Sequence, residues 1–279
     1  MLDETPTPPG LAAIAAGFVQ ARARGQALAA FPGEIPADLV SGYRVQDAAI
    51  ARWPDRVVGW KVGYIAAERR DASGDDRLLG PIFAGKLQPA DPDGEVEFEI
   101  FAGGFGAVEA EYVLRLEADA PAGKLDWTPE EAAALPATLL IGVEVASSPL
   151  ATINELGPRV VVSDFGNNNG LVLGPEIAGW TALDEADLIA ETFIDGVSVG
   201  HGGAQRLPGG LRAAFAFALG RSARRGRPLK RGELVATGNA TGIHDIAVGQ
   251  SARVDFADHA GIRLRARAAR PLPGAEDGA

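Results

Sequence analysis

The sequence of 279 residues contains no cysteine and only three histidines, all beyond position 200. The absence of cysteine excludes disulfide bonds, thiolate-ligated metals and a cysteine nucleophile. Lysine is also scarce, because only four of the 26 basic residues are lysines. Chemistry in the first two thirds of the chain must therefore use groups other than thiols and imidazoles.

Long apolar runs are missing too, since none approaches the ~20 residues that a membrane-spanning helix needs. The segment Leu11–Val19 lacks the basic flank of a signal peptide. A net charge of −11 argues against a general nucleic-acid-binding protein. These features predict a cytoplasmic protein that binds neither nucleic acid nor membrane. The basic run Arg221–Arg231 is interpreted as a solvated helix end and loop, because Gly226 and Pro228 mark a helix stop there.

The distribution of apolar residues predicts few helices and many strands. Helical patterning covers Leu11–Arg24, Ala37–Trp53, Pro129–Leu135 and Gly210–Arg224. A polar loop is expected from the end of the first strand through Asp76. Strands are predicted at Val57–Gly63, Glu95–Ile100, Ala107–Leu116, Leu139–Ala146, Arg159–Val162, Leu171–Leu173, Ile189–Val199, Glu233–Thr237, Ser251–Phe256 and Ile262–Ala268.

Many strands with few intervening helices favour an α+β fold with a substantial sheet or sandwich. We expect residues 1–56 to form a helical region packed on a β-rich domain of residues 57–279, with a frayed tail from about residue 271.

The most informative segment is Ala107–Leu116, because two glutamates alternate along a predicted strand. Glu109 and Glu111 share one face of such a strand, and Glu144 is the only charge in the apolar run Leu139–Ala146. Buried carboxylates repel one another, and a hard divalent cation such as Mg²⁺ or Mn²⁺ would resolve that repulsion. A Glu-x-Glu pair on a strand is by itself more often solvated than metal-bound, whereas the third glutamate in an apolar strand favours the metal site. Spacing alone therefore leaves both interpretations open.

Two further features bear on this alternative. Glu95, Glu97 and Glu99 also alternate, but apolar residues occupy the whole opposite face, which is typical of a half-exposed strand with a solvated acidic side. Lys61 lies inside the apolar run Val57–Gly63. It either extends its ammonium to water from a strand end or faces an anionic substrate and relays a proton.

An ordered set of short motifs resembles a known family. These motifs, in chain order, are Tyr43-Arg44-Val45-Gln46, Gly59-Trp60-Lys61-Val62-Gly63, Gly80-Pro81-Ile82-Phe83, Val108-Glu109-Ala110-Glu111, Gly142-Val143-Glu144, Asp164 to Gly170 (DFGNNNG) and Gly232 to Gly238 (GELVATG). The set is similar to the 2-keto-4-pentenoate hydratase and 4-oxalocrotonate decarboxylase group of the fumarylacetoacetate hydrolase superfamily. The similarity covers roughly positions 10 to 268, although DFGNNNG is one residue longer than the run usual in the family.

The resemblance implies a mixed β-roll or sandwich core with an N-terminal helical region, a Mg²⁺ or Mn²⁺ cofactor and a homo-oligomer. It implies that Glu109, Glu111 and Glu144 hold the metal and that Lys61 is catalytic. It further implies that the small 2-oxo acid substrate is bound by Leu79, Gly80, Asp164, Asn168 and Thr237.

The resemblance also implies a lyase that hydrates a 2-hydroxydienoate or decarboxylates a 4-oxalocrotonate-like acid. Two departures from the family pattern leave the substrate and the choice between these reactions open. Leu78 replaces an acidic residue, and Val145-Ala146-Ser147-Ser148-Pro149 follows the third glutamate. One alternative is an acylpyruvate-type C–C bond hydrolase, whose usual His–Glu pair has no histidine before position 201. His244 is the histidine that could lie near a pocket. The other alternative is a non-catalytic ligand-binding relative.

Overall fold

The computed structural model describes residues 7–275. The α-helices are α1 (Pro9–Arg24), α2 (Leu39–Ile50), α3 (Pro129–Ala133), α4 (Ile153–Leu156), α5 (Pro158–Ser163) and α6 (Gly210–Arg224). The strands are β1 (Val57–Tyr64), β2 (Arg77–Phe83), β3 (Leu87–Pro89), β4 (Val96–Ile100), β5 (Phe105–Leu116), β6 (Ala137–Ser148), β7 (Asn168–Ile177), β8 (Ile189–Ile194), β9 (Val197–Gly203), β10 (Leu234–Asn239), β11 (His244–Asp245), β12 (Ser251–Phe256) and β13 (Ala260–Ala268).

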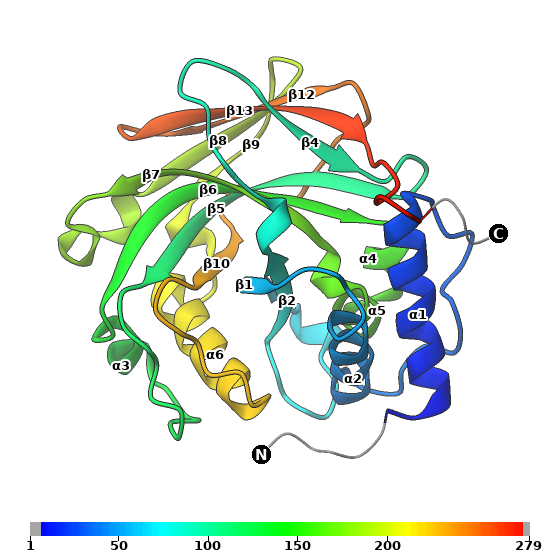
Figure 1. Cartoon of the computed structure of the whole chain (residues 1–279). Helices are drawn as coiled ribbons and strands as arrows, with labels where there is room; N and C mark the ends of the chain where they lie inside the picture. The colour runs from blue at the N-terminus through cyan, green and yellow to red at the C-terminus, as the bar shows by residue number, and fades with distance from the viewer. Residues whose placement is uncertain (1–6, 276–279) are drawn as a thin grey trace.

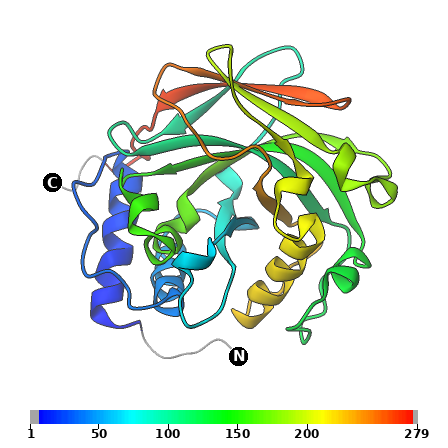
Figure 2. The same cartoon turned by 180° about the vertical axis from the view of Figure 1, so that it is seen from behind.

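The strands form two sheets. The larger has eight strands in the order β2-β1-β10-β5-β6-β7-β3, with β11 also paired to β5. The smaller has five strands in the order β4-β13-β12-β8-β9. The long strands β5, β6 and β7 arch through the middle of the molecule, with the smaller sheet above them and the helices below (Figures 1 and 2). The expected α+β fold is therefore confirmed.

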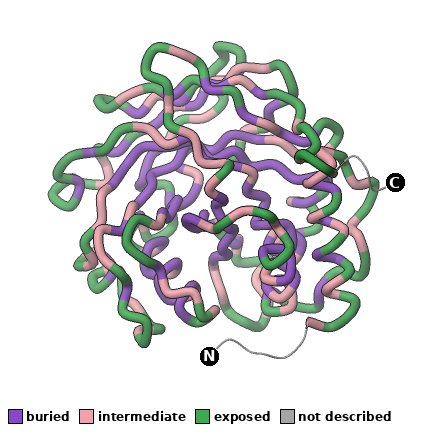
Figure 3. The backbone as a smooth tube through the Cα atoms, viewed as in Figure 1, coloured by how far each residue is buried: buried purple, intermediate pink, exposed green. Residues whose placement is uncertain are grey.

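The two faces of the larger sheet pack against different partners. On the outer face, Tyr112 of β5 meets Phe256 of the smaller sheet edge to face at 5.6 Å between ring centroids. Leu79 of β2 donates its backbone N–H to the Tyr43 hydroxyl of α2. The opposite face carries a small group of buried apolar residues that includes Val113 and Leu140. The buried residues run through the central strands (Figure 3), and the candidate site lies on this inner face.

The first two helices have recognisable end signals. Pro9 opens α1, and Gly25 ends it in the left-handed conformation with φ 63°. The side chain of Asp38 caps α2 by accepting a hydrogen bond from Ser41 N. Both helices fall within residues 1–56, although the domain boundary at residue 56 stays a prediction. No helix within residues 7–275 is long and apolar enough to cross a membrane.

Two secondary-structure predictions were wrong. Arg159–Val162 is part of the helix α5, because Pro158 occupies its first position and the segment has no strand neighbour to pair with. Ile189–Val199 is two strands, since Asp195-Gly196 turns the chain with both residues at positive φ. In addition, no strand was predicted for the segment around Gly80, which forms the strand β2 with all of its residues buried.

The basic run Arg221–Arg231 and the C-terminal tail differ in part from their predictions. The basic run is not simply solvated, because the side chain of Arg225 is only 8% exposed and stacks 4.4 Å from the Tyr43 ring centroid. At the C-terminus, Leu272 N donates to Ala23 O of α1. The rest of the predicted frayed tail, residues 276–279, lies outside the described residues.

Candidate active site

Strand register brings the three predicted glutamates together. In the antiparallel pair β5–β6, Glu109 lies directly opposite Glu144, and Glu111 lies opposite Gly142, one pair further along the same face. Side chains directly opposite each other across strands project to the same side of a sheet. The three carboxylates consequently converge, and one oxygen from each lies within 4.8 Å of the others.

The three carboxylates are buried, and some of their oxygens lack hydrogen-bond partners. The exposed fractions are 2% for Glu109 and 0% for Glu111 and Glu144. One buried oxygen of each carboxylate has no hydrogen-bond partner among the described residues, namely Glu109 Oε1, Glu111 Oε1 and Glu144 Oε2. Buried polar atoms without a partner are rare in folded proteins and require an explanation. No other group of three acidic, histidine or cysteine side chains with this spacing occurs within residues 7–275.

The remaining oxygens are held by groups from neighbouring strands. Glu111 Oε2 accepts a hydrogen bond of 2.7 Å from Gly238 N, which lies in a β-bulge of β10 opposite β5. The bulge turns this N–H out of the strand ladder and toward the carboxylate. Glu144 Oε1 accepts a hydrogen bond of 3.0 Å from Asn168 Nδ2 at the start of β7.

Lys61 of β1 reaches the same carboxylates. In the sheet it pairs with Ala236 of β10, which in turn pairs with Val113 of β5. The small Ala236 side chain leaves room for the lysine to extend over β10. The Lys61 Nζ lies 3.3 Å from Glu144 Oε1. The side chain of Lys61 is only 5% exposed, so its ammonium does not extend to bulk water.

Burial and mutual repulsion perturb this cluster. Burial and the charges of Glu144 and Glu109 raise the pKa of Glu111 well above its usual value. Burial likewise raises the pKa of Glu144 to about 7, although the Lys61 ammonium opposes the shift. Burial by itself lowers the pKa of Lys61, but attraction to the three carboxylates outweighs it and the net shift is upward. Full ionisation of three carboxyls beside one ammonium is therefore unfavourable unless further positive charge is present.

A cavity of about 310 Å³ opens beside the cluster and is lined by Lys61 and Glu109. Asn167 and Asn239 supply amide groups to its wall, and Arg69 from the 3-10 helix Ala67–Arg69 lines it as well. The remaining wall is largely apolar and includes Ile65, Leu78, Val161 and Ile243. The cavity therefore combines a charged end with an apolar wall.

The residues predicted to bind substrate lie in several places. None of the five is among the described residues that line the 310 Å³ cavity; Leu78 lines it, whereas its neighbour Leu79 is 0% exposed. Gly80 packs against the backbone of the α5–β7 segment, where a Cβ would lie 2.3 Å from Phe165 O. Thr237 donates to Tyr112 O at 2.7 Å and lines a neighbouring cavity of about 230 Å³.

Asn168 and Asp164 lie in the α5–β7 segment behind the carboxylates. Asn168 contacts Glu144 directly, as described above. Asp164 is buried in an ion pair with Arg22 of α1, with Arg22 Nε 2.5 Å from Asp164 Oδ1. The substrate-binding roles of both residues stay predictions.

Arg22 was missed by the sequence analysis although the sequence carries a signal for it. It follows Ile14 and Phe18 at four-residue spacing, so all three project from one face of α1, and all three are buried. A charge on an apolar helix face needs a buried partner. The partner lies more than 140 residues away, so only the structure identifies it.

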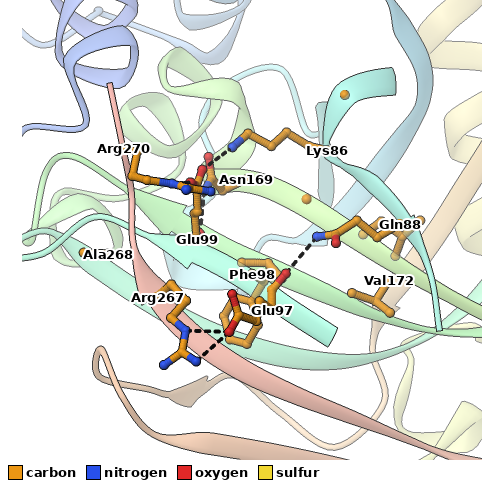
Figure 4. A pocket seen from close by; sticks show the side chains of 14 residues that line it. Lys86, Gln88, Glu97, Phe98, Glu99, Asn169, Val172, Arg267, Ala268 and Arg270 are labelled. Atoms are coloured by element: carbon orange, nitrogen blue, oxygen red, sulfur yellow. Dashed lines mark hydrogen bonds and ion pairs between the residues drawn. The ribbon is translucent and has the colours of Figure 1, made fainter. Parts of the chain in front are cut away.

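The glutamates of the acidic strand Glu95–Ile100 form ion pairs and are not among the described residues with the spacing of a metal site. Its glutamates pair with basic residues of neighbouring segments, since Glu97 binds Arg267, and Glu99 binds Lys86 and Arg270. These pairs line a second cavity of about 500 Å³ between the two sheets (Figure 4). The prediction of a half-exposed acidic face is correct, with arginines as additional partners.

The histidines lie outside the cavity wall. His244 of β11 pairs with Val108 in the sheet, and its Nε2 lies 3.1 Å from Thr241 Oγ1. Neither this residue nor His201 or His259 is among the described residues that line the 310 Å³ cavity.

Comparison of the sequence with protein-family models and with curated proteins gave no match. Comparison of the structure did. 4-Oxalocrotonate decarboxylase from Pseudomonas putida G7, complexed with magnesium and adipate, is 19% identical and has a TM-score of 0.78, covering 95% of this chain and 100% of that one. Fumarylpyruvate hydrolase from Pseudomonas aeruginosa, in complex with Mn²⁺ and pyruvate, is 15% identical with a TM-score of 0.55, covering 77% of this chain and 90% of that one. Fumarylacetoacetate hydrolase from Exiguobacterium antarcticum is 19% identical with a TM-score of 0.55, covering 77% of this chain and 76% of that one.

Fold and site together define a β-rich α+β protein with three buried carboxylates beside a cavity. The fold is shared with the solved 4-oxalocrotonate decarboxylase, fumarylpyruvate hydrolase and fumarylacetoacetate hydrolase, so the fold that the sequence resemblance implied is confirmed. Proteins named decarboxylase and hydrolase share it, and for this reason the reaction must be argued from the site.

Proposed function

We propose that this protein is a divalent-metal-dependent enzyme acting on a small 2-oxo or 2-hydroxydienoic acid, and that its reaction is a lyase reaction. The observation that carries the proposal is the cluster of Glu109, Glu111 and Glu144, each with one unpartnered buried oxygen, next to Lys61 and the 310 Å³ cavity.

The donor set fits a hard cation. Three carboxylate oxygens without hydrogen-bond partners provide the oxygen ligands that Mg²⁺ and Mn²⁺ prefer, and the excess negative charge would be balanced. When bound by these glutamates, the ion would supply positive charge for the substrate's carboxylate and 2-oxygen. Proteins of this fold complexed with magnesium and adipate, or with Mn²⁺ and pyruvate, support such a pairing of metal and small acid.

The protein's own groups would then orient the acid and manage its charge. Asn167 and Asn239 can donate hydrogen bonds to a ligand in the cavity, and Arg69 adds a positive charge where the cavity is exposed. The apolar wall formed by Ile65, Leu78 and neighbouring residues suits a hydrocarbon chain and excludes water around it.

Lys61 is the group best placed for proton transfer or charge balance. Its Nζ lies 3.3 Å from Glu144 Oε1, and the residue lines the cavity, so its ammonium can donate a proton to a bound acid or stabilise an oxygen that becomes negative. Hydration adds hydroxide to C4 and a proton to C3 of the conjugated 2-oxo acid. Decarboxylation releases a distal carboxylate as CO₂ and places a proton on the carbon left behind. Both reactions build negative charge on the 2-oxygen, and both remain open.

An acylpyruvate hydrolase ranks lower. In that reaction a base must activate water for attack on a carbonyl, and the usual histidine is not among the described residues that line the cavity. A non-catalytic binding protein ranks lower too, since a purely structural role does not explain a buried lysine among three buried glutamates at a cavity wall.

The test is an assay of the purified protein with Mg²⁺ or Mn²⁺ on three substrate types: 2-hydroxydienoates, a 4-oxalocrotonate-type diacid and an acylpyruvate. Ultraviolet absorbance follows loss of the conjugated acid, and product analysis distinguishes a 4-hydroxy-2-oxo acid from CO₂ release. We expect turnover of a dienoate or the diacid that disappears with chelator. Rapid cleavage of the acylpyruvate with the dienoates untouched would reverse the ranking, and no metal binding at all would favour the non-catalytic alternative.

A further inference from the structure

The side chain of Arg22 makes an unusual number of contacts for a residue on a terminal helix. Its Nε and Nη2 bind the two carboxylate oxygens of Asp164 at 2.5 and 2.9 Å. Its Nη1 donates to Asn168 O at 3.2 Å, and its Nη2 donates to Ser147 O at 3.0 Å. The side-chain exposures of Arg22 and Asp164 are only 3% and 0%. A guanidinium buried this deeply costs much unless all of its donors are used.

These contacts join the two strands that carry the back of the site. Ser147 follows Glu144 on β6 by three residues, and Asn168 begins β7. Between these strands the register shifts, because Ala146 pairs with Asn168 and Val145 pairs with Gly170. Asn169 is therefore the extra residue of a β-bulge.

Arg22 also orders the bulge itself. Its Nη1 donates to Asn169 Oδ1 at 3.1 Å, and Asn169 Nδ2 donates to Glu99 O of the smaller sheet at 2.7 Å (Figure 4). The rings of Phe101 and Phe165 enclose the guanidinium at 5.4 and 5.0 Å. The bulge is thus held from α1 and from the smaller sheet, and it cannot relax without breaking buried hydrogen bonds.

Asn168 connects the Arg22 side chain to Glu144. Its backbone oxygen is fixed by Arg22, and its side-chain Nδ2 donates to Glu144 Oε1. Groups that hydrogen-bond to a metal-ligating carboxylate orient it, and their loss typically lowers metal affinity about 10–100-fold. We propose that Arg22 and Asp164 are positioning residues that act through Asn168 to aim Glu144 at the cation.

This inference rests on the proposed metal site and assigns Asp164 a role through Arg22 in place of substrate contact. It gives the N-terminal helix a function, because α1 then supplies the residue that preorganises the back of the site. It predicts that the effects of Arg22 and Asn168 are coupled, since one acts through the other.

The experiment measures the dissociation constant of Mn²⁺ alone, by calorimetry and by the electron paramagnetic resonance signal of free Mn²⁺, on the folded full-length protein without substrate. Arg22→Met and Asn168→Ala should each raise the Kd for Mn²⁺ about tenfold. The Kd of the double variant should not exceed the higher of the two single-variant values. If Arg22→Met does not fold, Asp164→Asn and Arg22→Lys replace it, each with a smaller expected increase.

Arg225→Met is the matched control. Arg225 is also a buried arginine, with Asp47 as partner at 2.6 Å and the rings of Tyr43 and Trp60 at 4.4 and 5.0 Å. It contacts none of the three glutamates, so this variant should lose stability but keep the wild-type Kd.

Two outcomes would overturn the inference while leaving the proposed function in place. An unchanged Kd in Arg22→Met, with a stability loss like that of Arg225→Met, would assign Arg22 to folding alone. Additive effects of Arg22→Met and Asn168→Ala would show that the two residues act independently. Failure of the wild-type protein to bind Mn²⁺ would instead contradict the proposed function, and the inference with it.

Discussion

At the residue scale, Lys61 differs from the other lysines in being buried and in having three carboxylates as its charge partners. A Lys86 side chain, by comparison, is 30% exposed and pairs with the single carboxylate of Glu99 at 2.8 Å. Removal of the ammonium should therefore lower turnover at Lys61 but not at Lys86.

Lys61→Met should lower kcat about 100-fold or more, because proton transfer or charge balance at the 2-oxygen would be lost. With Mg²⁺ present the fold should persist, since the cation offsets the carboxylate repulsion. Steady-state kinetics and circular dichroism check both statements, and Lys86→Met is the control that should retain full turnover. Wild-type turnover with lost stability would assign Lys61 to structure.

Arg69 lines the cavity and donates one hydrogen bond, from Nη1 to Asn154 O at 2.6 Å. It has no carboxylate partner among the described residues, so its charge is available to an anionic ligand. Arg69→Met should raise KM about tenfold with kcat nearly unchanged, because a charged hydrogen bond at an exposed position contributes to binding more than to the reaction.

The matched control is Arg56→Met, an exposed arginine that lines none of the described cavities. Its kinetics should equal those of the wild type. Equal KM values for the Arg69 and Arg56 variants would remove Arg69 from the binding site.

At the element scale, the α5–β7 segment must approach β2 very closely. A Cβ at Gly80 would lie 2.3 Å from Phe165 O and 3.0 Å from the Cα of Gly166, and a Cβ at Gly166, whose φ is 63°, would lie 2.7 Å from the Cα of Gly80. No side chain fits between the two backbones. The glycine therefore sets how near the segment bearing Asn167 and Asn168 can come to the strand bearing Leu78.

Gly80→Ala should destabilise the protein by about 1–3 kcal/mol, because the backbone of the segment would have to shift. Gly123→Ala is the control, since a Cβ there meets nothing within 4 Å. Denaturant unfolding of both variants measures the difference. Equal stability of the two would mean that the contact between β2 and the segment is looser than the structure indicates.

Element prediction succeeded where alternation along a strand decides. It failed where strand pairing decides and where a turn divides an apolar run. The alternation in Ala107–Leu116 was sufficient to place β5 and the shared face of Glu109 and Glu111. Arg159–Val162 has strand-like residues but no partner strand, and the preceding Pro158 begins a helix. The pair Asp195-Gly196 is a local turn signal that divides the predicted strand Ile189–Val199.

At the scale of the whole molecule, the buried glutamates oppose folding unless something balances them. Their raised pKa values, described for Glu111 and Glu144, express the cost of burying like charges. A ligand that binds only the folded state stabilises it, by about 2.7 kcal/mol at a concentration of about 100 Kd.

Mn²⁺ or Mg²⁺ should therefore raise the Tm of the wild-type protein, and chelator should reverse the effect. Glu111→Gln should be more stable than the wild type in chelator, because it removes one buried charge and keeps an acceptor for Gly238 N. It should gain much less from the metal. Calorimetric scans of both proteins, with and without metal, check this, and an equal metal-induced rise in both would exclude Glu111 as a ligand.

What the sequence by itself determined is local. Residue alternation placed Glu109 and Glu111 on one face, and an isolated charge in an apolar run singled out Glu144 and Lys61, because burying a charge always requires a partner. The ordered motifs then indicated the fold that the structure confirms.

Only the tertiary structure decided which strands lie side by side. The pairing of β5 with β6 sets Glu109 opposite Glu144, the bulge in β10 directs Gly238 N to Glu111, and α1 carries Arg22 to Asp164. Each of these contacts joins segments more than 30 residues apart. Local propensity does not encode such distances, because the register of distant strands is selected by burial of the whole sheet's apolar face.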